Sequence, residues 1–153
     1  EMETRSDLEK DILQQLPDRP RVCILGGTAF KEASSEHLTK ALAHEFSKKL
    51  SHQAVVITGG MPGVQQTFVQ SLGSDFGAVV HLLPEGNESK FPVGVDLRAG
   101  RDLPERMHIF GNLGHVYLTI EGGPGVAKEA KQASERGAFV LPMICTGGAS
   151  SGM

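Results

Sequence analysis

The sequence predicts an α/β protein with a Rossmann-like, doubly wound parallel sheet of about five or more strands and helices on both faces. Five short apolar runs alternate with segments whose apolar residues recur at helical spacing. The chain of 153 residues holds 19 glycines but only 5% aromatic residues. Alternating strands and helices are typical of a covered parallel sheet, and the glycine content favours many tight turns over a β-sandwich.

The five apolar runs have the length of buried parallel strands, because each is short and bounded by residues that favour turns. They cover residues 22–25, 54–58, 78–83, 115–120 and 138–141. Cys23 lies inside the first run, so we expect a buried and inert thiol. The segment 84–100 has no clear period and is rich in Gly, Pro and charge, which predicts a functional or partly mobile loop.

Four amphipathic helices are predicted between the strands. We expect Ser34 or Ser35 to cap the first helix, and Pro62 to lie in the first turn of the second. Asp102 starts the third, and Gly137 follows the fourth as a C-terminal cap. The apolar stripes of these helices are, in order, Leu38, Leu42, Phe46 and Leu50; Val64, Phe68 and Leu72; Leu103, Met107 and Phe110; and Val126, Ala130 and Ala133.

The first twenty residues form a separate segment. Apolar residues recur at helical spacing from Leu8 to Leu16, and Pro17 stops the pattern. We expect residues 1–20 to be an amphipathic helix that packs on the outside of a single nucleotide-binding domain at 21–153. An arm that binds a partner is the alternative.

Composition excludes several classes of protein. The net charge of −3, from 15 Lys and Arg against 18 Asp and Glu, argues against a nucleic-acid partner. No apolar run nears the roughly 20 residues of a membrane span, and no signal segment is present. Two cysteines are too few for a disulfide framework, and the six histidines lack zinc-ligand spacing, so we expect no metal. We therefore expect a soluble, cytoplasmic protein, and the start at Glu1 rather than Met indicates an excised piece.

Three glycine-rich turns follow strands whose carboxyl ends meet at one edge of the predicted sheet. Glycine lets a backbone approach a ligand closely, and N–H groups at the start of a helix favour an anion. We interpret the turns as a phosphate site, with simple chain reversal as the alternative. Neither a P-loop nor the G-x-G-x-x-G dinucleotide pattern is present. The candidate phosphate-binding or nucleotide-binding residues are Gly26, Gly27, Thr28, Gly59, Gly60, Gly63, Gly122, Gly123, Gly125 and Val126.

The third turn resembles a motif of the LONELY GUY family, Rossmann-like proteins long mislabelled as lysine decarboxylases. Residues 121–129 read EGGPGVAKE, which is similar to the family's P-G-G-x-G-T-x-x-E box. Glu121 replaces the proline and Val126 replaces the threonine, while Glu129 matches the final glutamate.

Two further features extend the resemblance over residues 21–144. The stretch 57–64 is similar to the family's G-G-x-x-G-V/L-M turn, with Gln65 in place of the methionine. Arg106 lies ahead of the box at a spacing close to that of the family.

The resemblance implies a phosphoribohydrolase that cleaves a nucleoside 5′-monophosphate, often an N6-modified AMP, to free base and ribose 5-phosphate. It also implies a homodimer, no metal and no organic cofactor, with Arg106 and Glu129 as catalytic residues. A carboxylate suits this reaction, because breaking a glycosidic bond builds positive charge on the sugar.

The two altered box positions support an alternative. Val126 has no hydroxyl to bind phosphate, and a carboxylate at Glu121 repels an anion unless it turns away or is paired. The alternative is a non-catalytic carrier or sensor that binds a nucleotide or the molybdenum cofactor. A pure interaction module is a third possibility.

Overall fold

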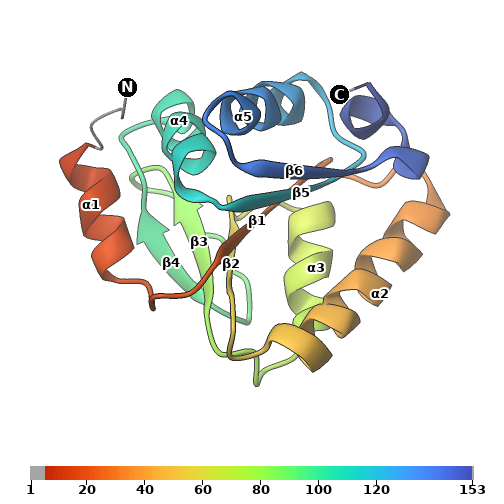
Figure 1. Cartoon of the computed structure of the whole chain (residues 1–153), viewed down its shortest axis with the longest axis horizontal. Coiled ribbons are helices and arrows are strands. Elements are labelled where there is room, and N and C mark those ends of the chain that lie inside the picture. The colour runs from red at the N-terminus through yellow and green to blue at the C-terminus, as the bar shows by residue number, and fades with distance from the viewer. Residues whose placement is uncertain (1–5, 153) are drawn as a thin grey trace.

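The computed structural model describes residues 6–152, which form one six-stranded, all-parallel sheet in the order β4-β3-β2-β1-β5-β6 (Figure 1). The predicted Rossmann-like α/β fold is confirmed. The chain runs outward from β1 to β4 and then returns to the other side of β1, so the strand order reverses between β1 and β5. The strands are β1 (Arg21–Gly26), β2 (Val55–Thr58), β3 (Val79–Leu83), β4 (Val95–Arg98), β5 (Val116–Ile120) and β6 (Phe139–Met143).

In the described part of the chain, five helices cover the two faces of the sheet (Figure 1). One core layer packs α2 and α3 against the sheet, and the other packs α1, α4 and α5 against the opposite face. None of the helices within residues 6–152 is long and apolar enough to cross a membrane. The helices are α1 (Asp7–Gln14), α2 (Ala33–Leu50), α3 (Val64–Leu72), α4 (Leu103–Leu113) and α5 (Pro124–Glu135), followed by two 3-10 turns, η1 (Ile144–Thr146) and η2 (Gly148–Ser151).

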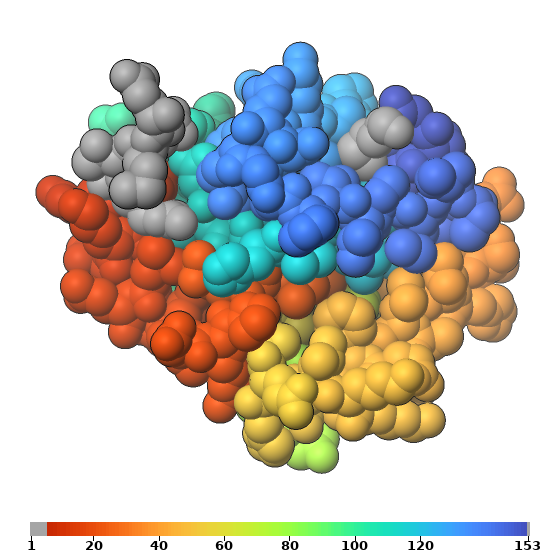
Figure 2. Space-filling view, in the orientation of Figure 1, coloured from red at the N-terminus to blue at the C-terminus, as the bar shows by residue number. Residues whose placement is uncertain are grey.

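The N-terminal segment contributes to the core. Ile12 of α1 is fully buried in the layer that α1 shares with α4 and α5. The start of the predicted helix, residues 1–5, lies outside the described residues. In the space-filling view, the red N-terminal segment, the orange α2 region and the blue C-terminal third form most of the surface on this side (Figure 2).

The expectation that 84–100 is a loop is wrong for its second half, because residues 95–98 form β4. β4 is an edge strand: Val95 is 61% exposed and only Leu97 packs against the core. A strand with one inward side chain leaves no apolar run in the sequence, which is why the pattern did not show it.

Helix starts were predicted less well than helix faces. Asp102 caps α4 as expected, since its carboxylate accepts the N–H of Glu105 at 3.0 Å. Neither predicted serine caps α2: its N-cap is Glu32, which makes no side-chain capping bond, and Ser35 lies buried in the first turn. Pro62 lies outside α3, whose N-cap is Gly63.

Candidate functional site

The carboxyl ends of β1, β2 and β5 bring the three glycine turns together. The N–H of Val64, at the start of α3, donates to the carbonyl of Gly27 at 3.1 Å. The N–H of Gly27 in turn donates to the carbonyl of Ile120, at the end of β5, at 3.4 Å. This edge lies at the reversal of strand order between β1 and β5, which is where doubly wound sheets bind their ligands.

Two of the predicted phosphate-site glycines are required for packing between turns. A β-carbon at Gly26 would lie 2.5 Å from Cβ of Val64. A β-carbon at Gly63, where φ is +80°, would lie 2.5 Å from the carbonyl oxygen of Gly27 and from the backbone of Thr28. Side chains at these positions would separate the first two turns, so these glycines allow the turns to meet.

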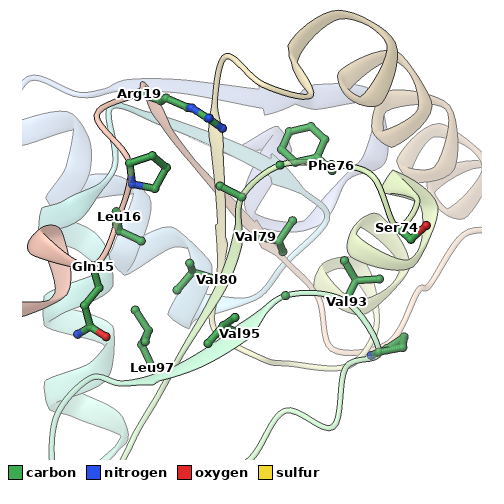
Figure 3. Close-up of a pocket in the computed structure, with 15 residues that line it drawn as sticks. Gln15, Leu16, Arg19, Ser74, Phe76, Val79, Val80, Val93, Val95 and Leu97 are labelled. Carbon is green, nitrogen blue, oxygen red and sulfur yellow. The ribbon is translucent and has the colours of Figure 1, made fainter.

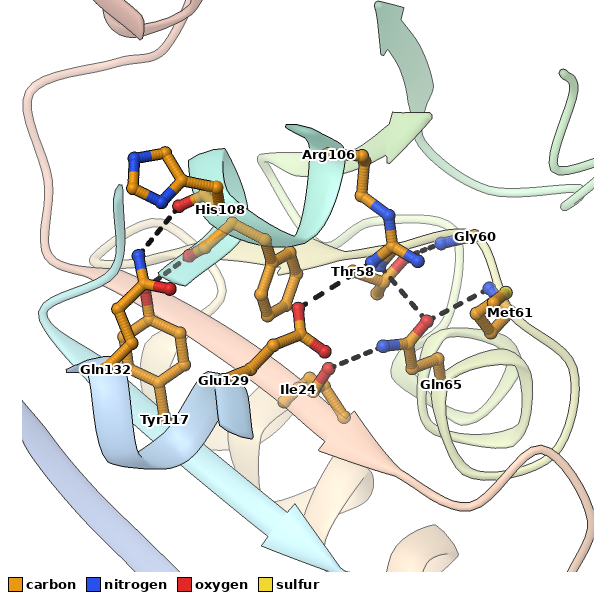
Figure 4. A network of polar contacts seen from close by, with 12 residues as sticks. Ile24, Thr58, Gly60, Met61, Gln65, Arg106, His108, Tyr117, Glu129 and Gln132 are labelled. Atoms are coloured by element: carbon orange, nitrogen blue, oxygen red, sulfur yellow. Dashed lines mark hydrogen bonds and ion pairs between the residues drawn. The ribbon is translucent and has the colours of Figure 1, made fainter. Parts of the chain in front are cut away.

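Arg106 and Glu129 lie beside these turns as a buried pair (Figure 4). Arg106 is on α4 and Glu129 on α5, and their side chains are only 4% and 8% exposed. Nη1 of Arg106 is 3.9 Å from Oε2 of Glu129, an ion-pair distance without a hydrogen bond. Among the described residues, neither Nε of Arg106 nor Oε2 of Glu129 has a hydrogen-bond partner. The pair can therefore still form hydrogen bonds with a third group, through Nε of Arg106 and Oε2 of Glu129.

Burial dominates the electrostatics of the pair. Desolvation raises the pKa of Glu129 to about 7, although the nearby charge of Arg106 acts to lower it. Desolvation also lowers the pKa of Arg106 from its usual value, and Glu129 acts to raise it. A carboxylate that titrates near neutral pH inside a site is typical of functional groups.

The second glycine turn supports Arg106. A β-carbon at Gly59 would lie 2.2 Å from Nη1 of Arg106, so only glycine leaves room for the guanidinium. Gln65 fixes this turn: its Oε1 accepts the N–H groups of Gly59 and Met61 at 3.1 and 3.0 Å. Its Nε2 donates to the carbonyl of Ile24 in β1 at 2.9 Å (Figure 4).

Thr58 and His81 complete the support of this turn. Oγ1 of Thr58 accepts the N–H of Gly60 at 3.0 Å and lies 2.7 Å from Nδ1 of the buried His81. Nε2 of His81 lies 2.7 Å from the carbonyl of Val93 and therefore donates to it. The N–H groups of Gly59, Gly60 and Met61 are thus bound within the protein.

Sequence reasoning did not identify Gln65 as a site residue, although it noted that Gln65 departs from the family motif. The signal was a long polar side chain on the apolar face of a helix that follows a glycine turn. A buried amide needs several partners, and the turn supplies them.

The third glycine turn, residues 122–125, leaves open space at the N-terminus of α5. Gly122 has φ +99°, and a β-carbon there would meet Val126 at 2.8 Å. Gly123 is the N-cap of α5 and a β-carbon there would meet nothing within 4 Å. The first-turn N–H groups of Gly125 and Val126 face out of the helix end, as in any α-helix. The side chain of Val126 instead packs into the core.

Glu121 turns away from this open helix end. Its Oε1 accepts the N–H of Lys31 at 2.9 Å, and its Oε2 accepts the N–H of Glu32 at 3.1 Å. Burial alone raises the pKa of Glu121, but these N–H groups hold it below its usual value. The carboxylate is therefore paired, and it serves as the cap that α2 lacks in its own sequence.

No group of three or more His, Cys, Asp or Glu side chains within residues 6–152 lies close enough to hold a metal ion. A separate pocket of about 670 Å³ lies at the amino ends of β3 and β4, opposite the glycine turns (Figure 3). Its walls are mainly apolar and include Leu16, Phe76, Val80 and Leu97.

The doubly wound parallel sheet, with glycine turns at the carboxyl ends of its strands, places the protein in the Rossmann-like class of α/β proteins. The chain belongs to the SLOG cluster4 family, whose profile matches residues 19–148. The resemblance to LONELY GUY is thereby supported at the level of the Rossmann-like SLOG superfamily. No match was found among curated proteins.

Three solved structures share the fold at low sequence identity. TM1055 is 23% identical, with a TM-score of 0.73, over 86% of this chain and 78% of its own. The molybdenum cofactor carrier protein of Chlamydomonas reinhardtii is 21% identical, with a TM-score of 0.64, over 80% and 75%. DNA processing protein A of Streptococcus pneumoniae is 17% identical, with a TM-score of 0.61, over 88% of this chain and 50% of its own.

Proposed function

We propose that this chain is a phosphoribohydrolase that cleaves the N-glycosidic bond of a nucleoside 5′-monophosphate. The observation that carries the proposal is the buried pair of Arg106 and Glu129, held 3.9 Å apart beside an open helix end. The resemblance to LONELY GUY supports an N6-modified AMP as the preferred substrate and a homodimer, and the low cysteine content supports a cytoplasmic location.

The reaction adds water across one bond. The bond between C1′ of the ribose and the base nitrogen breaks, the water oxygen bonds to C1′ as a hydroxyl, and the proton that the water loses ends on the base, so that the products are free base and ribose 5-phosphate. Positive charge builds on the sugar in the transition state, and the carboxylate of Glu129 stabilises it and aligns the attacking water. Arg106 orients Glu129 or binds a ribose oxygen, as the unfilled hydrogen-bonding capacity of both side chains allows.

The phosphate is assigned to the N-terminus of α5. The N–H groups of Gly123, Gly125 and Val126 lie there, and the helix dipole favours negative charge at that end. The N–H groups of the second turn are taken by Gln65 and Thr58, so Gly59 and Gly60 line the site without binding the anion.

A non-catalytic carrier or sensor is the second candidate. Val126 supplies no hydroxyl to the phosphate, and its side chain packs in the core. The fold is shared with a molybdenum cofactor carrier protein. Such a protein needs the open glycine turn but not the Arg106–Glu129 pair.

Chromatography of the free base separates the two candidates. Purified protein is incubated with AMP and with N6-isopentenyl AMP, and Glu129→Gln is compared with Glu135→Gln, an exposed change on the same helix. We expect the rate of base release to fall by about 100-fold or more in Glu129→Gln and to stay at the wild-type level in Glu135→Gln. The affinity of Glu129→Gln for AMP should stay within about threefold of the wild-type value. Binding without release in the wild-type protein would favour the carrier.

A further inference from the structure

The turn between β1 and α2 already holds an anion that belongs to the chain itself. In doubly wound sheets the turn after the central strand is a common phosphate position, because its N–H groups and the following helix favour negative charge. Here the N–H groups of Lys31 and Glu32 point at the carboxylate of Glu121, one at each oxygen. Glu121 is 2% exposed, so a ligand does not share these donors.

Glu121 is held firmly in this position. Its φ is +53°, in the left-handed region that residues with a side chain rarely adopt. The C-terminal turns stabilise it: the N–H of Glu121 donates to Oγ1 of Thr146 at 2.8 Å. Both the N–H and the hydroxyl of Ser150 donate to the carbonyl of Glu121, at 3.1 and 2.8 Å. Three hydrogen bonds from the C-terminal turns thus fix the backbone of Glu121, and its carboxylate points at the start of α2.

The two candidate anion positions are neighbours. A β-carbon at Gly27, in the first turn, would lie 3.7 Å from the backbone nitrogen of Gly122 and 3.9 Å from Oε1 of Glu121. A ligand phosphate bound at the N-terminus of α5 would therefore lie next to the anion position that the carboxylate of Glu121 occupies. A second phosphoryl group that extends toward α2 would meet a buried negative charge instead of free N–H groups, and the two like charges would repel each other.

We propose that Glu121 is a specificity-determining residue that occupies the anion position of the first strand–helix turn and so restricts the site to ligands with a single phosphoryl group. This inference rests on the proposed placement of the ligand phosphate at α5, but it does not require hydrolysis.

The test compares binding of AMP and ADP to the wild-type protein and two variants. Glu121→Gln removes the charge and keeps the size of the side chain, and Glu32→Gln makes the same change at an exposed side chain that caps nothing. We expect the wild-type protein to bind ADP at least about tenfold more weakly than AMP. Glu121→Gln should narrow that ratio to about threefold or less, and Glu32→Gln should leave it unchanged. An unchanged ratio in a folded Glu121→Gln protein, or equal wild-type binding of AMP and ADP, overturns the proposal.

Amide NMR of the wild-type protein tests the same point without a variant. Titration with AMP should shift the signals of Gly125 and Val126 and leave those of Lys31 and Glu32 in place. Shifts at Lys31 and Glu32 of the same size, or none at Gly125 and Val126, would overturn it. If the protein shows the expected binding pattern but releases no base, the proposed hydrolysis is wrong and the proposed role of Glu121 is still supported.

Discussion

Nη1 of Arg106 and Oε2 of Glu129 lie 3.9 Å apart, near enough for strong charge attraction and too far for a hydrogen bond. Two helices, α4 and α5, hold the side chains at this separation, and both are more than nine-tenths buried. A buried pair that does not close on itself is a costly arrangement for stability alone. It is well suited to a group that enters between or beside the two charges.

The pH dependence of turnover should report Glu129. Its pKa is raised to about 7, and the proposed role needs the carboxylate form, so kcat/KM should rise about tenfold per pH unit below 7 and level off above it. Initial rates of base release between pH 5 and 9 measure this. A profile that falls through pH 7 would instead make Glu129 a proton donor, and a rising limb retained in Glu129→Gln would assign it to another group.

Gly59→Ala should impair the site through Arg106. The added methyl group would lie 2.2 Å from Nη1, so the guanidinium must leave its present position beside Glu129. We expect turnover to fall by about tenfold or more, because small misplacements of a catalytic group are expensive. The control is Gly152→Ala, where a β-carbon meets nothing within 4 Å. If a folded Gly59→Ala protein turned over substrate at the wild-type rate, catalysis would not require the guanidinium of Arg106 at its present position against Gly59.

Gln65→Met should destabilise the protein. Methionine is the residue of the resembled motif, but here it would leave the N–H groups of Gly59 and Met61 and the carbonyl of Ile24 without their partner. Unsatisfied buried groups cost about 1–3 kcal/mol each, so urea unfolding should show a loss of at least about 1 kcal/mol. Gln70→Met, an exposed change on the same helix, should shift the unfolding free energy by less than about 0.5 kcal/mol. Equal losses in both variants would contradict a supporting role for Gln65.

His81 should make the folded state sensitive to mild acid. Desolvation lowers its pKa below 6.5, despite opposing effects of the Val93 carbonyl and of Asp96. Below pH 6.5 the unfolded chain therefore binds a proton that the folded chain does not, and the unfolding free energy falls by up to about 1.4 kcal/mol per pH unit. Above pH 6.5 the effect of His81 on the unfolding free energy no longer changes with pH.

Urea unfolding at pH 5.5, 6.5 and 7.5 measures this dependence. The decrease below pH 6.5 should shrink in His81→Asn and persist in His37→Asn, since His37 is exposed. A decrease that is the same in both variants would show that other groups cause it.

β1, β2, β3 and β5 were predictable because they are buried on both faces. β6 is an edge strand in which Phe139 is 73% exposed, and it was predictable because its residues are nonetheless apolar. The ends of the five predicted runs differ from those of the strands by at most two residues. β4 was missed because an edge strand with one inward side chain has no apolar run. The cap of α2 was missed for a different reason: its acceptor, Glu121, lies 89 positions along the chain from Glu32.

The alternation of strands and helices follows from the sequence alone, and so does the edge of the sheet at which the glycine turns gather, because both depend on local period and on the rule that parallel strands end at one edge. Arg106 and Glu129 were assigned to the site through the resemblance to LONELY GUY. The distance between Arg106 and Glu129 emerges only in the folded protein, as do the contacts by which Gln65 occupies the N–H groups of one turn and Glu121 those of another. Each of these contacts joins separate elements of the fold, so its geometry follows from how helices and strands pack and not from any local pattern.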